Sequence, residues 1–304
     1  MPLIVGWYSL VIYLLNRREV QQRIGATIGR IRGIPGGSSS GVRRRVGRGR
    51  AVTLLTAIWV VAAVSLVGFV ATEKSGDDLV ATFFETSRGD MIFIETPSGT
   101  RLLIDGGDNS DLAVANLESV LPPLDRRIDV LLSTHPDADH LGGLQQIVER
   151  FDVGVIVDSG VGHSSDIYAS WSRVIGGHER VITAQPGLVV ALDDEVVLTI
   201  LQTGCEVVAC SNFNDEGVVA RLEFRDVSIL LTGDATSGAE TDLLLTGQHV
   251  KSTVLKVGHH GSRTSTTQRF LDTVDPTVAI VTTGIKNQFG HPHEDVIERL
   301  ESSL

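Results

Sequence analysis

Short apolar runs separated by turns follow one another along residues 76–304 of this 304-residue chain. Runs of about four to eight residues bounded by Gly, Pro or Asp are typical of strands, whereas apolar residues three and four positions apart indicate helices. These criteria predict strands at 79–85, 91–96, 101–105, 128–132, 153–158, 181–185, 188–201, 227–232, 254–257 and 278–283. They predict helices at 111–120, 144–151, 166–175, 265–274 and a last one ending near Leu300. This alternation favours an α/β fold with two sheets sandwiched between helices.

Two apolar segments precede this domain. Residues 51–72 form a run of 22 residues without a charge, which is long enough to cross the hydrocarbon core of a bilayer. We therefore predict a transmembrane helix there. Residues 1–15 are also apolar but short, so this segment is the tail of a span, an interfacial segment or the apolar part of a signal. A cleaved signal is disfavoured because the basic residues follow the apolar run and none precede it.

The charge distribution is strongly uneven. The whole chain carries a net charge of −11, yet residues 16–50 contain ten Arg and one Glu, together with a Gly and Ser cluster at 36–41. Such a composition cannot bury a core, so 16–50 is predicted to be a flexible loop. It could be a nucleic-acid-binding arm, but a cytoplasmic loop that touches anionic membrane lipid explains the charge more simply. The positive-inside rule then places the domain at 76–304 outside the cytoplasm.

A dense group of candidate metal ligands lies between the predicted strand at 128–132 and the helix at 144–151. Within six residues of this strand-to-helix loop the chain places His135, Asp137, Asp139 and His140. Imidazole and carboxylate groups together suit borderline or hard divalent cations. A polar turn in which Asp139 is only an N-terminal helix carboxylate is the alternative. Four such groups followed by Gly-Gly favour the metal site.

This pattern, His-x-Asp-x-Asp-His, resembles the first metal motif of the metallo-β-lactamase superfamily, which usually has His where Asp137 stands. With Asp at this position, the motif resembles that of the C-terminal domain of ComEC-type DNA-uptake channel proteins. The resemblance implies a metallo-β-lactamase-like αββα sandwich at 76–304, preceded by N-terminal transmembrane segments. Because that family carries a multi-helix channel ahead of this domain, we expect the chain to be part of a longer or split protein.

The resemblance also implies further site residues. Asp234, after the strand at 227–232, matches the carboxylate that bridges two metals, and the family spacing places Asn214 where a His often stands. In His-His-Gly-Ser we expect His260 to be a ligand and His259 to contact a leaving or bridging oxygen. His291 in Gly-His-Pro is expected to complete the mouth of the site. With Asp137 and Asn214 the first pocket is rich in oxygen, which shifts preference from Zn²⁺ towards Mn²⁺ or Mg²⁺.

Three other features lead to weaker expectations. The family's Asp-Val-Gly-Gln-Gly-Asp loop matches only at Gly89 and Asp90, which we interpret mainly as a hairpin turn. Asp105 is expected to contact a ligating His and orient its ring without binding the metal itself. Cys205 and Cys210 are close enough in sequence for a disulfide, although two free buried thiols fit almost as well.

The expected function is a membrane-anchored hydrolase that uses two divalent metal ions. By resemblance it is a phosphodiesterase or nuclease that acts on single-stranded DNA during uptake, with Asp139, His259 and His291 as catalytic residues and a membrane channel chain as partner. The metals would activate a water for attack on the phosphodiester. Two alternatives remain: a hydrolase of the same fold that acts on a small ester, lactam or phosphodiester, and a catalytically idle element of the DNA channel. The acidic domain offers no general basic surface, so DNA contacts would depend on the metals and on Arg88, Lys256 and Arg263.

Overall fold

The computed structural model describes residues 10–11, 77–210, 213–284 and 287–304. The predicted segments at 1–15, 16–50 and 51–72 therefore lie outside the described residues, apart from the short strand at 10–11. Within the described ranges, no helix combines the length and the apolar composition that a membrane crossing requires.

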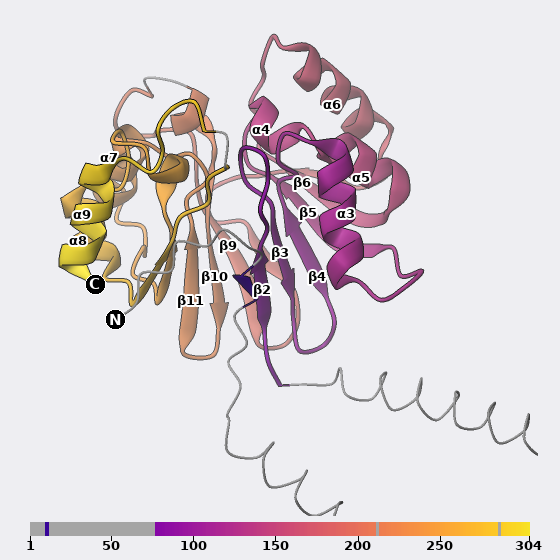
Figure 1. Cartoon of the computed structure of the whole chain (residues 1–304), viewed down its shortest axis with the longest axis horizontal. Helices are drawn as coiled ribbons and strands as arrows, with labels where there is room; N and C mark the ends of the chain where they lie inside the picture. The colour runs from indigo at the N-terminus through magenta and orange to yellow at the C-terminus, as the bar shows by residue number, and fades with distance from the viewer. Residues whose placement is uncertain (1–9, 12–76, 211–212, 285–286) are drawn as a thin grey trace, which may run out of the picture. The chain divides into compact units, whose positions relative to one another are not determined.

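The first sheet has seven strands among the described residues, and sequence order equals spatial order (Figure 1). Its first four strands pair antiparallel and the remaining pairs are parallel. The strands are β1 (Leu10–Val11), β2 (Val80–Phe83), β3 (Ile92–Glu95), β4 (Arg101–Ile104), β5 (Arg127–Ser133), β6 (Asp152–Asp158) and β7 (Val181–Thr183). The predicted hairpin between the strands at 79–85 and 91–96 is therefore confirmed by the β2–β3 pair.

The second sheet has six strands in the described part of the chain, in the order β13-β12-β11-β10-β9-β8. Strands β11, β12 and β13 run parallel, and the others pair antiparallel. The strands are β8 (Val189–Ala191), β9 (Val196–Thr203), β10 (Val218–Phe224), β11 (Val227–Leu231), β12 (Val254–Lys256) and β13 (Val278–Ile280).

Helices cover the outer face of each sheet, so the domain is the expected four-layer sandwich (Figure 1). Three clusters of buried apolar side chains match this order: one between the sheets, one under the helices of the first sheet and one under those of the second. The helices over the first sheet are α3 (Ser110–Val120), α4 (Ala138–Leu141), α5 (Leu144–Arg150) and α6 (Asp166–Gly177). Those over the second are α7 (Ser237–Leu245), α8 (Gln268–Val274) and α9 (Glu294–Ser303).

Three details of the predicted pattern need correction. The apolar run at 188–201 is two strands, because Asp193 accepts hydrogen bonds from the backbone N–H groups of Glu195 and Val196 and closes a tight turn between β8 and β9. Helix α8 begins at Gln268 and not at 265, since the Thr267 side chain accepts the N–H of Phe270 and caps it. Strand β10 and helix α7 were not predicted, although both contribute to the buried clusters.

The carboxyl ends of the parallel strands bring the predicted motifs to one edge of the sandwich. The loop after β5 carries His135, the loop after β11 carries Asp234, and the turn after β12 carries His260. Gly106 and Gly143 allow the neighbouring turns to approach closely, because a Cβ atom on Gly143 would lie 2.2 Å from the Gly106 carbonyl oxygen. The turn at Gly106 therefore packs closely against the end of the metal loop.

Candidate metal centre

Two imidazoles, one in the β5–α4 loop and one in α4, are held by contacts to their Nδ1 atoms. His140 Nδ1 lies 2.7 Å from Asp105 Oδ2, and His135 Nδ1 lies 3.0 Å from the Thr134 hydroxyl oxygen. Asp105 also accepts the backbone N–H and the hydroxyl of Thr134, at 2.9 and 2.6 Å. One buried carboxylate therefore organises the loop, and the Nε2 atoms of both histidines are left to face the site, as expected for metal ligands.

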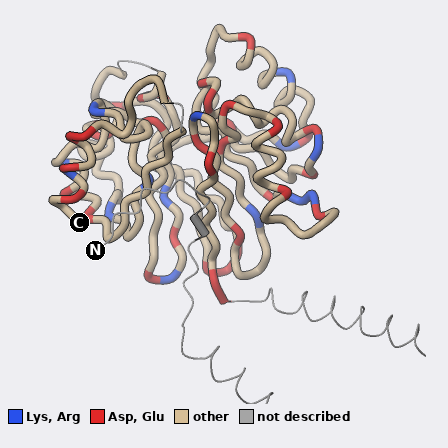
Figure 2. Tube along the Cα trace, in the orientation of Figure 1, with Lys and Arg blue, Asp and Glu red and all other residues tan. Residues whose placement is uncertain are grey.

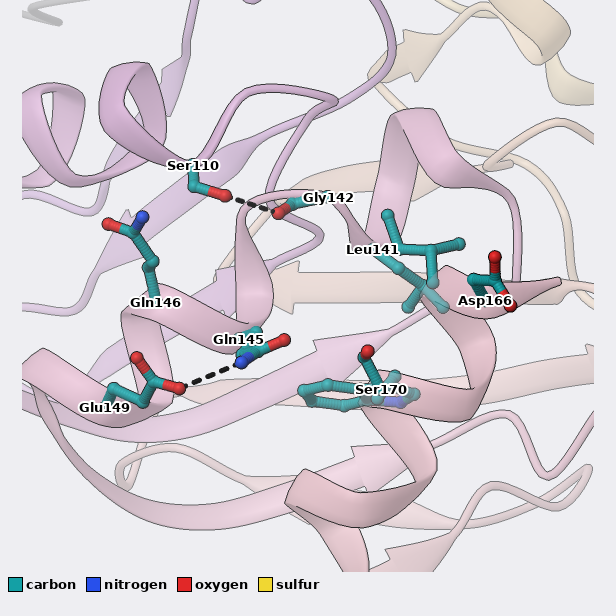
Figure 3. Close-up of a pocket in the computed structure, with 10 residues that line it drawn as sticks. Ser110, Leu141, Gly142, Gln145, Gln146, Glu149, Asp166 and Ser170 are labelled. Atoms are coloured by element: carbon teal, nitrogen blue, oxygen red, sulfur yellow. Dashed lines mark hydrogen bonds between the residues drawn. The ribbon is translucent and has the colours of Figure 1, made fainter.

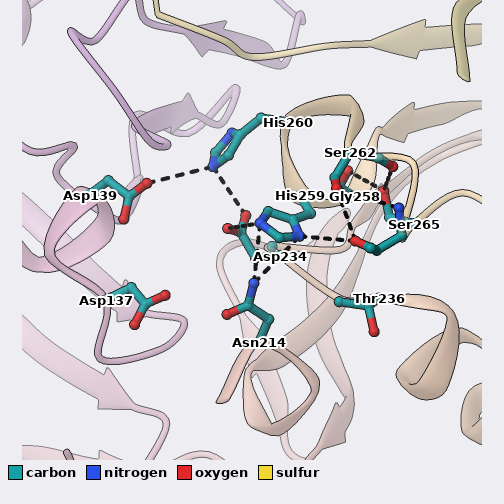
Figure 4. A network of polar contacts seen from close by, with 12 residues as sticks. Asp137, Asp139, Asn214, Asp234, Thr236, Gly258, His259, His260, Ser262 and Ser265 are labelled. Atoms are coloured by element: carbon teal, nitrogen blue, oxygen red, sulfur yellow. Dashed lines mark hydrogen bonds and ion pairs between the residues drawn. The ribbon is translucent and has the colours of Figure 1, made fainter. Parts of the chain in front are cut away.

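Asp234 is the central carboxylate of the site. Its Oδ1 atom lies 3.5 Å from His140 Nε2 and 3.3 Å from His260 Nε2. Its Oδ2 atom lies 3.9 Å from His135 Nε2 and 3.9 Å from His259 Nε2. Each oxygen thus faces a different pair of imidazoles, which is the arrangement that a carboxylate bridging two cations requires. Figure 4 shows Asp234 between His260 and His259.

The paired histidines occupy a short 3-10 turn, η2 (Gly258–Gly261), after β12. His259 and His260 both have positive φ angles, 47° and 54°, so their side chains leave the backbone in different directions. His260 Nδ1 contacts the Thr282 carbonyl oxygen at 3.1 Å, and this contact turns Nε2 towards Asp234. His259 is partly exposed and points to the other Asp234 oxygen. This geometry agrees with His260 as a metal ligand. The Nε2 atom of His259 is also close enough to Asp234 to bind a metal at the same centre.

Four buried atoms at the centre of the site have no hydrogen-bond partner among the described residues: His135 Nε2, His140 Nε2, Asp234 Oδ1 and His260 Nε2. An unsatisfied buried polar atom costs about 1–3 kcal/mol, so four that converge on one point require a partner. Nitrogen and carboxylate oxygen donors within 4.8 Å of one another suit divalent cations. The residues present therefore fit a metal centre.

The two aspartates of the motif flank this centre. Asp137 Oδ2 lies 3.8 Å from His135 Nε2, and Asp139 Oδ2 lies 4.0 Å from His260 Nε2. Asp137 occupies the N-cap position of α4, but its side chain accepts no capping hydrogen bond. Asp139 instead forms an ion pair with Arg88, with Nε and Oδ2 3.3 Å apart. Helix capping therefore does not account for Asp137, whereas Asp139 lies in the first turn of α4 and also faces the centre.

Asn214 and His291 complete the set of predicted residues. Asn214, on the 3-10 turn η1 (Phe213–Glu216), places its Nδ2 atom 3.3 Å from His259 Nε2. The His291 ring packs edge-on against the His259 ring, with centroids 5.6 Å apart. Asn214 thus supports His259, and His291 lies at the mouth of the site, where it lines a cavity. The structure brings the other eight predicted site residues together around Asp234.

The electrostatics of the site follow from burial and from the facing carboxylates. Burial and the nearby His140 hold the pKa of His135 well below its usual value. Burial also disfavours charge on His140, but Asp234 and Asp105 outweigh it and raise the pKa of His140 well above its usual range. Burial raises the pKa of Asp234, yet His260 and His140 outweigh it and hold that pKa well below the usual value. Metal ligation would therefore displace a proton from His140, whereas His135 is already neutral.

Asp90 and Lys256 belong to the site although the sequence pattern did not show it. Asp90 Oδ2 forms a short ion pair with Lys256 Nζ, and Asp90 Oδ1 accepts the Thr282 hydroxyl at 2.5 Å. Lys256 also donates to the Gly233 carbonyl at 2.8 Å and lies 3.9 Å from Asp234 Oδ1. The expectation that Lys256 contacts DNA is wrong, because the residue is 0% exposed. The position of Lys256 within the apolar run 254–257 was the feature of the sequence that could have indicated a buried lysine.

Two cavities of about 280 and 370 Å³ open onto the centre and share Arg88, Asp139, His259 and Phe289 in their walls. A larger cavity of about 430 Å³ lies elsewhere, under α6, and its described lining residues include no histidine (Figure 3). Two of its polar pairs are internal, Gln145 with Glu149 at 2.9 Å and Ser110 with the Gly142 carbonyl at 2.8 Å, whereas Gln146 Oε1 is buried without a hydrogen-bond partner among the described residues. The chemistry is therefore concentrated at the metal centre.

The model of the metallo-beta-lactamase superfamily matches residues 86–284, which is more than half of the chain. The chain belongs to this superfamily. It is 27% identical over 243 residues to ComE operon protein 3 of Bacillus subtilis (strain 168), covering 71% of this chain and 30% of that protein. It is 29% identical over 254 residues to Competence protein ComA of Neisseria gonorrhoeae, covering 79% of this chain and 33% of that protein. The predicted relationship to the ComEC family is confirmed.

Among solved structures, the metallo-beta-lactamase fold protein YhfI of Bacillus subtilis is similar with a TM-score of 0.47 and 15% identity, covering 71% of this chain and 86% of that one. The chain spans about a third of the length of its curated relatives. It contains a metallo-beta-lactamase-fold hydrolase domain, and the fold together with the ligand clusters implies that the domain uses divalent metal.

Proposed function

We propose that the domain is a metal-dependent phosphodiesterase that cuts a DNA strand during DNA uptake. The observation that carries the proposal is the position of Asp234, whose two oxygens face different pairs of imidazoles. Such a carboxylate suits two cations side by side, and a pair of cations can activate water and stabilise the attacking and leaving oxygens of a phosphodiester. The competence proteins among the relatives supply the expectation that DNA is the substrate.

The site residues would have different roles in metal binding and in contact with the substrate. His135, His140, Asp234 and His260 are the best placed to hold metal, with Asp137 and Asp139 at the flanks. His259, held near Asn214, faces the cavity from which a scissile phosphate would approach. Arg88 lines the same cavity and is the group best placed to meet a phosphate oxygen. His291 would limit the access of water to the cavity mouth.

The choice of metal follows from the donor set. Asp137 and Asn214 stand where imidazoles are usual, so one half of the site offers more oxygen than nitrogen. We expect Mn²⁺ to be preferred, with Zn²⁺ or Mg²⁺ as the alternatives.

The setting of the domain is also part of the proposal. Residues 51–72 would anchor the chain in the membrane, the Arg-rich residues 16–50 would touch anionic lipid, and a channel chain would be the partner. The Cys205–Cys210 disulfide supports a place for the domain outside the cytoplasm, because disulfides persist in oxidising compartments.

The test is cleavage of single-stranded DNA by the purified full chain in detergent with Mn²⁺. Asp139→Ala removes a flanking carboxylate, and Asp226→Asn changes an exposed carboxylate in the turn between β10 and β11. We expect cleavage by the parent and by Asp226→Asn, and its loss in Asp139→Ala and on chelation. Absence of cleavage by a parent chain that binds Mn²⁺, Mg²⁺ or Zn²⁺ would sink the proposal and favour a hydrolase of a small ester. A chain that binds no metal would favour the idle channel element.

A further inference from the structure

Exposed phenylalanine side chains are concentrated at the metal centre. Of the phenylalanines that the structure describes, five are buried in the core clusters and Phe224 packs against one of them. Phe289 and Phe213 are instead 57% and 47% exposed. Exposure of a large aromatic ring to water is unfavourable, so two such rings beside one site indicate a contact that the ligand supplies.

Phe289 is part of the wall of both cavities over the centre. Its ring stacks on the His291 ring, with centroids 5.7 Å apart and an interplanar angle of 27°. The His291 ring in turn packs against His259, whose Nε2 atom lies 3.9 Å from Asp234 Oδ2. A continuous series of rings thus leads from the exposed Phe289 to the metal centre.

Phe213 lies beside the same mouth. Its ring packs edge-on against His163, with centroids 5.0 Å apart, and His163 lines the cavity that Phe289 also lines. Phe213 begins the η1 turn, whose next residue is Asn214. The Cys205–Cys210 disulfide holds this turn, since both sulfur atoms lie against the Asp215 carbonyl oxygen, at 3.7 and 3.4 Å. The ring is therefore presented by a fixed turn.

Charge does not supply a comparable attraction for a polyanion. Figure 2 shows Lys and Arg scattered among Asp and Glu along the described part of the chain, with no basic stripe. Arg88 is the one Lys or Arg among the described residues that line the two cavities, and it is paired with Asp139. Binding that depends little on phosphate charge must use the bases, and aromatic rings stack on the bases of any sequence.

We propose that Phe289 and Phe213 form a stacking platform for unpaired bases, which makes the site selective for single-stranded over duplex DNA. The proposal rests on the phosphodiesterase function and names its substrate class. In a duplex the faces of the bases are covered by their neighbours, so only an unpaired strand can place a base on Phe289 while its phosphate reaches the centre.

The test compares two strands of equal length and charge, an oligothymidylate and an abasic strand that carries the same phosphates without bases. Dissociation constants are measured by fluorescence anisotropy for the full chain in detergent with a chelator, so that neither strand is cut. Any contact of the Arg-rich residues 16–50 with phosphates would contribute equally to both strands, because the two strands carry the same phosphates. We expect the parent to prefer the thymidylate about tenfold, and Phe289→Ala to bring the ratio close to one. Phe289→Trp should keep the preference, and Phe213→Ala should reduce it in part.

A second readout separates stacking from a structural effect. A strand that contains 2-aminopurine loses fluorescence when that base stacks, so binding to the parent should quench it and binding to Phe289→Ala should not. Leu124→Ala, which shortens a side chain that is 95% exposed in the loop after α3, is the control and should behave as the parent does.

Equal affinity of the parent for the two strands would overturn the platform. So would a Phe289→Ala variant that weakens both strands by the same factor. Cleavage by the parent with Mn²⁺ is scored separately. A parent chain that cleaves DNA but binds the two strands equally well sinks the platform alone. A parent chain that cleaves no DNA sinks the phosphodiesterase and the platform with it.

Discussion

His140 donates a hydrogen bond from Nδ1 to Asp105 Oδ2 over 2.7 Å, and the two residues are 0% and 1% exposed. Because the Nδ1 proton is committed to Asp105, Nε2 is the atom that faces Asp234, and its lone pair becomes available to a cation once the Nε2 proton is displaced. The same carboxylate holds Thr134, which contacts His135. One buried group therefore sets the orientation of two candidate ligands.

Asp105→Asn is predicted to weaken Mn²⁺ binding by about 10- to 100-fold, because the amide can no longer both accept from Thr134 and fix the His140 ring. Isothermal titration of the metal-free chain with Mn²⁺ measures the change. The exposed Asp226→Asn variant is the control and should bind as the parent does. Unchanged affinity in Asp105→Asn would show that the contact does not orient a ligand.

The buried pair of Asp90 and Lys256 is predicted to be necessary for stability of the metal-free domain. Lys256→Met leaves Asp90 buried without its counter-charge, at a cost of roughly 3–5 kcal/mol in the free energy of unfolding. Burial raises the pKa of Asp90, but the charge of Lys256 is the main cause that lowers it, and the pKa lies below its usual value. Denaturant unfolding in the presence of a chelator measures the loss.

A double variant tests whether this loss arises from the pair. Asp90→Asn combined with Lys256→Met removes both charges, so it should be more stable than Lys256→Met alone. If the two substitutions simply add, the ion pair is not the cause and the packing of the long Lys256 stem is.

His291 gives the metal-free domain a pH-dependent term in its stability. Burial, together with the neighbouring His259 and His293, lowers the pKa of His291 to about 4, whereas the usual value is 6.5. Between these values the unfolded chain binds a proton that the folded chain does not. Above about pH 6.5 His291 therefore has no effect on the free energy of unfolding. As the pH falls from there towards about 4, protonation of the unfolded chain lowers that free energy.

The measurement is chelated denaturant unfolding of the parent and of His291→Gln on either side of that window. The parent should lose more stability on acidification than the variant does, since glutamine does not titrate. An identical loss in both proteins would place the pH dependence elsewhere. Because the ring is partly exposed, only the direction is predicted.

The Cys205–Cys210 disulfide is predicted to stabilise the η1 turn more than the whole domain. It closes a loop with a sequence separation of 5, so the model of chain entropy gives a contribution of about 2 kcal/mol. Replacement of both cysteines by serine should lower the free energy of unfolding by about that amount. Faster amide exchange confined to residues 205–216 would be the local sign, and exchange that rises evenly over the second sheet would contradict it.

The sequence by itself determined the local parts of this protein. Short apolar runs bounded by turn residues, and helical spacing, predicted most strands and helices of the sandwich, and the position of the His135 motif after a buried strand predicted its loop. The tight spacing of His135, Asp137, Asp139 and His140 also predicted that a metal site would be found there. These are properties of neighbouring residues, which a linear pattern records.

Only the tertiary structure decided which distant residues complete the centre. Asp90 was interpreted as a turn residue and Lys256 as a surface cation, yet the two meet inside the core because β3 and β12 belong to facing sheets that end at the same edge. The order of strands in the first sheet sets Arg88 against Asp139. Phe213 packs against His163, which lines the same cavity as Phe289. Periodicity along the chain fixes which face a side chain takes within its element, whereas its partners across the sandwich depend on strand order and register.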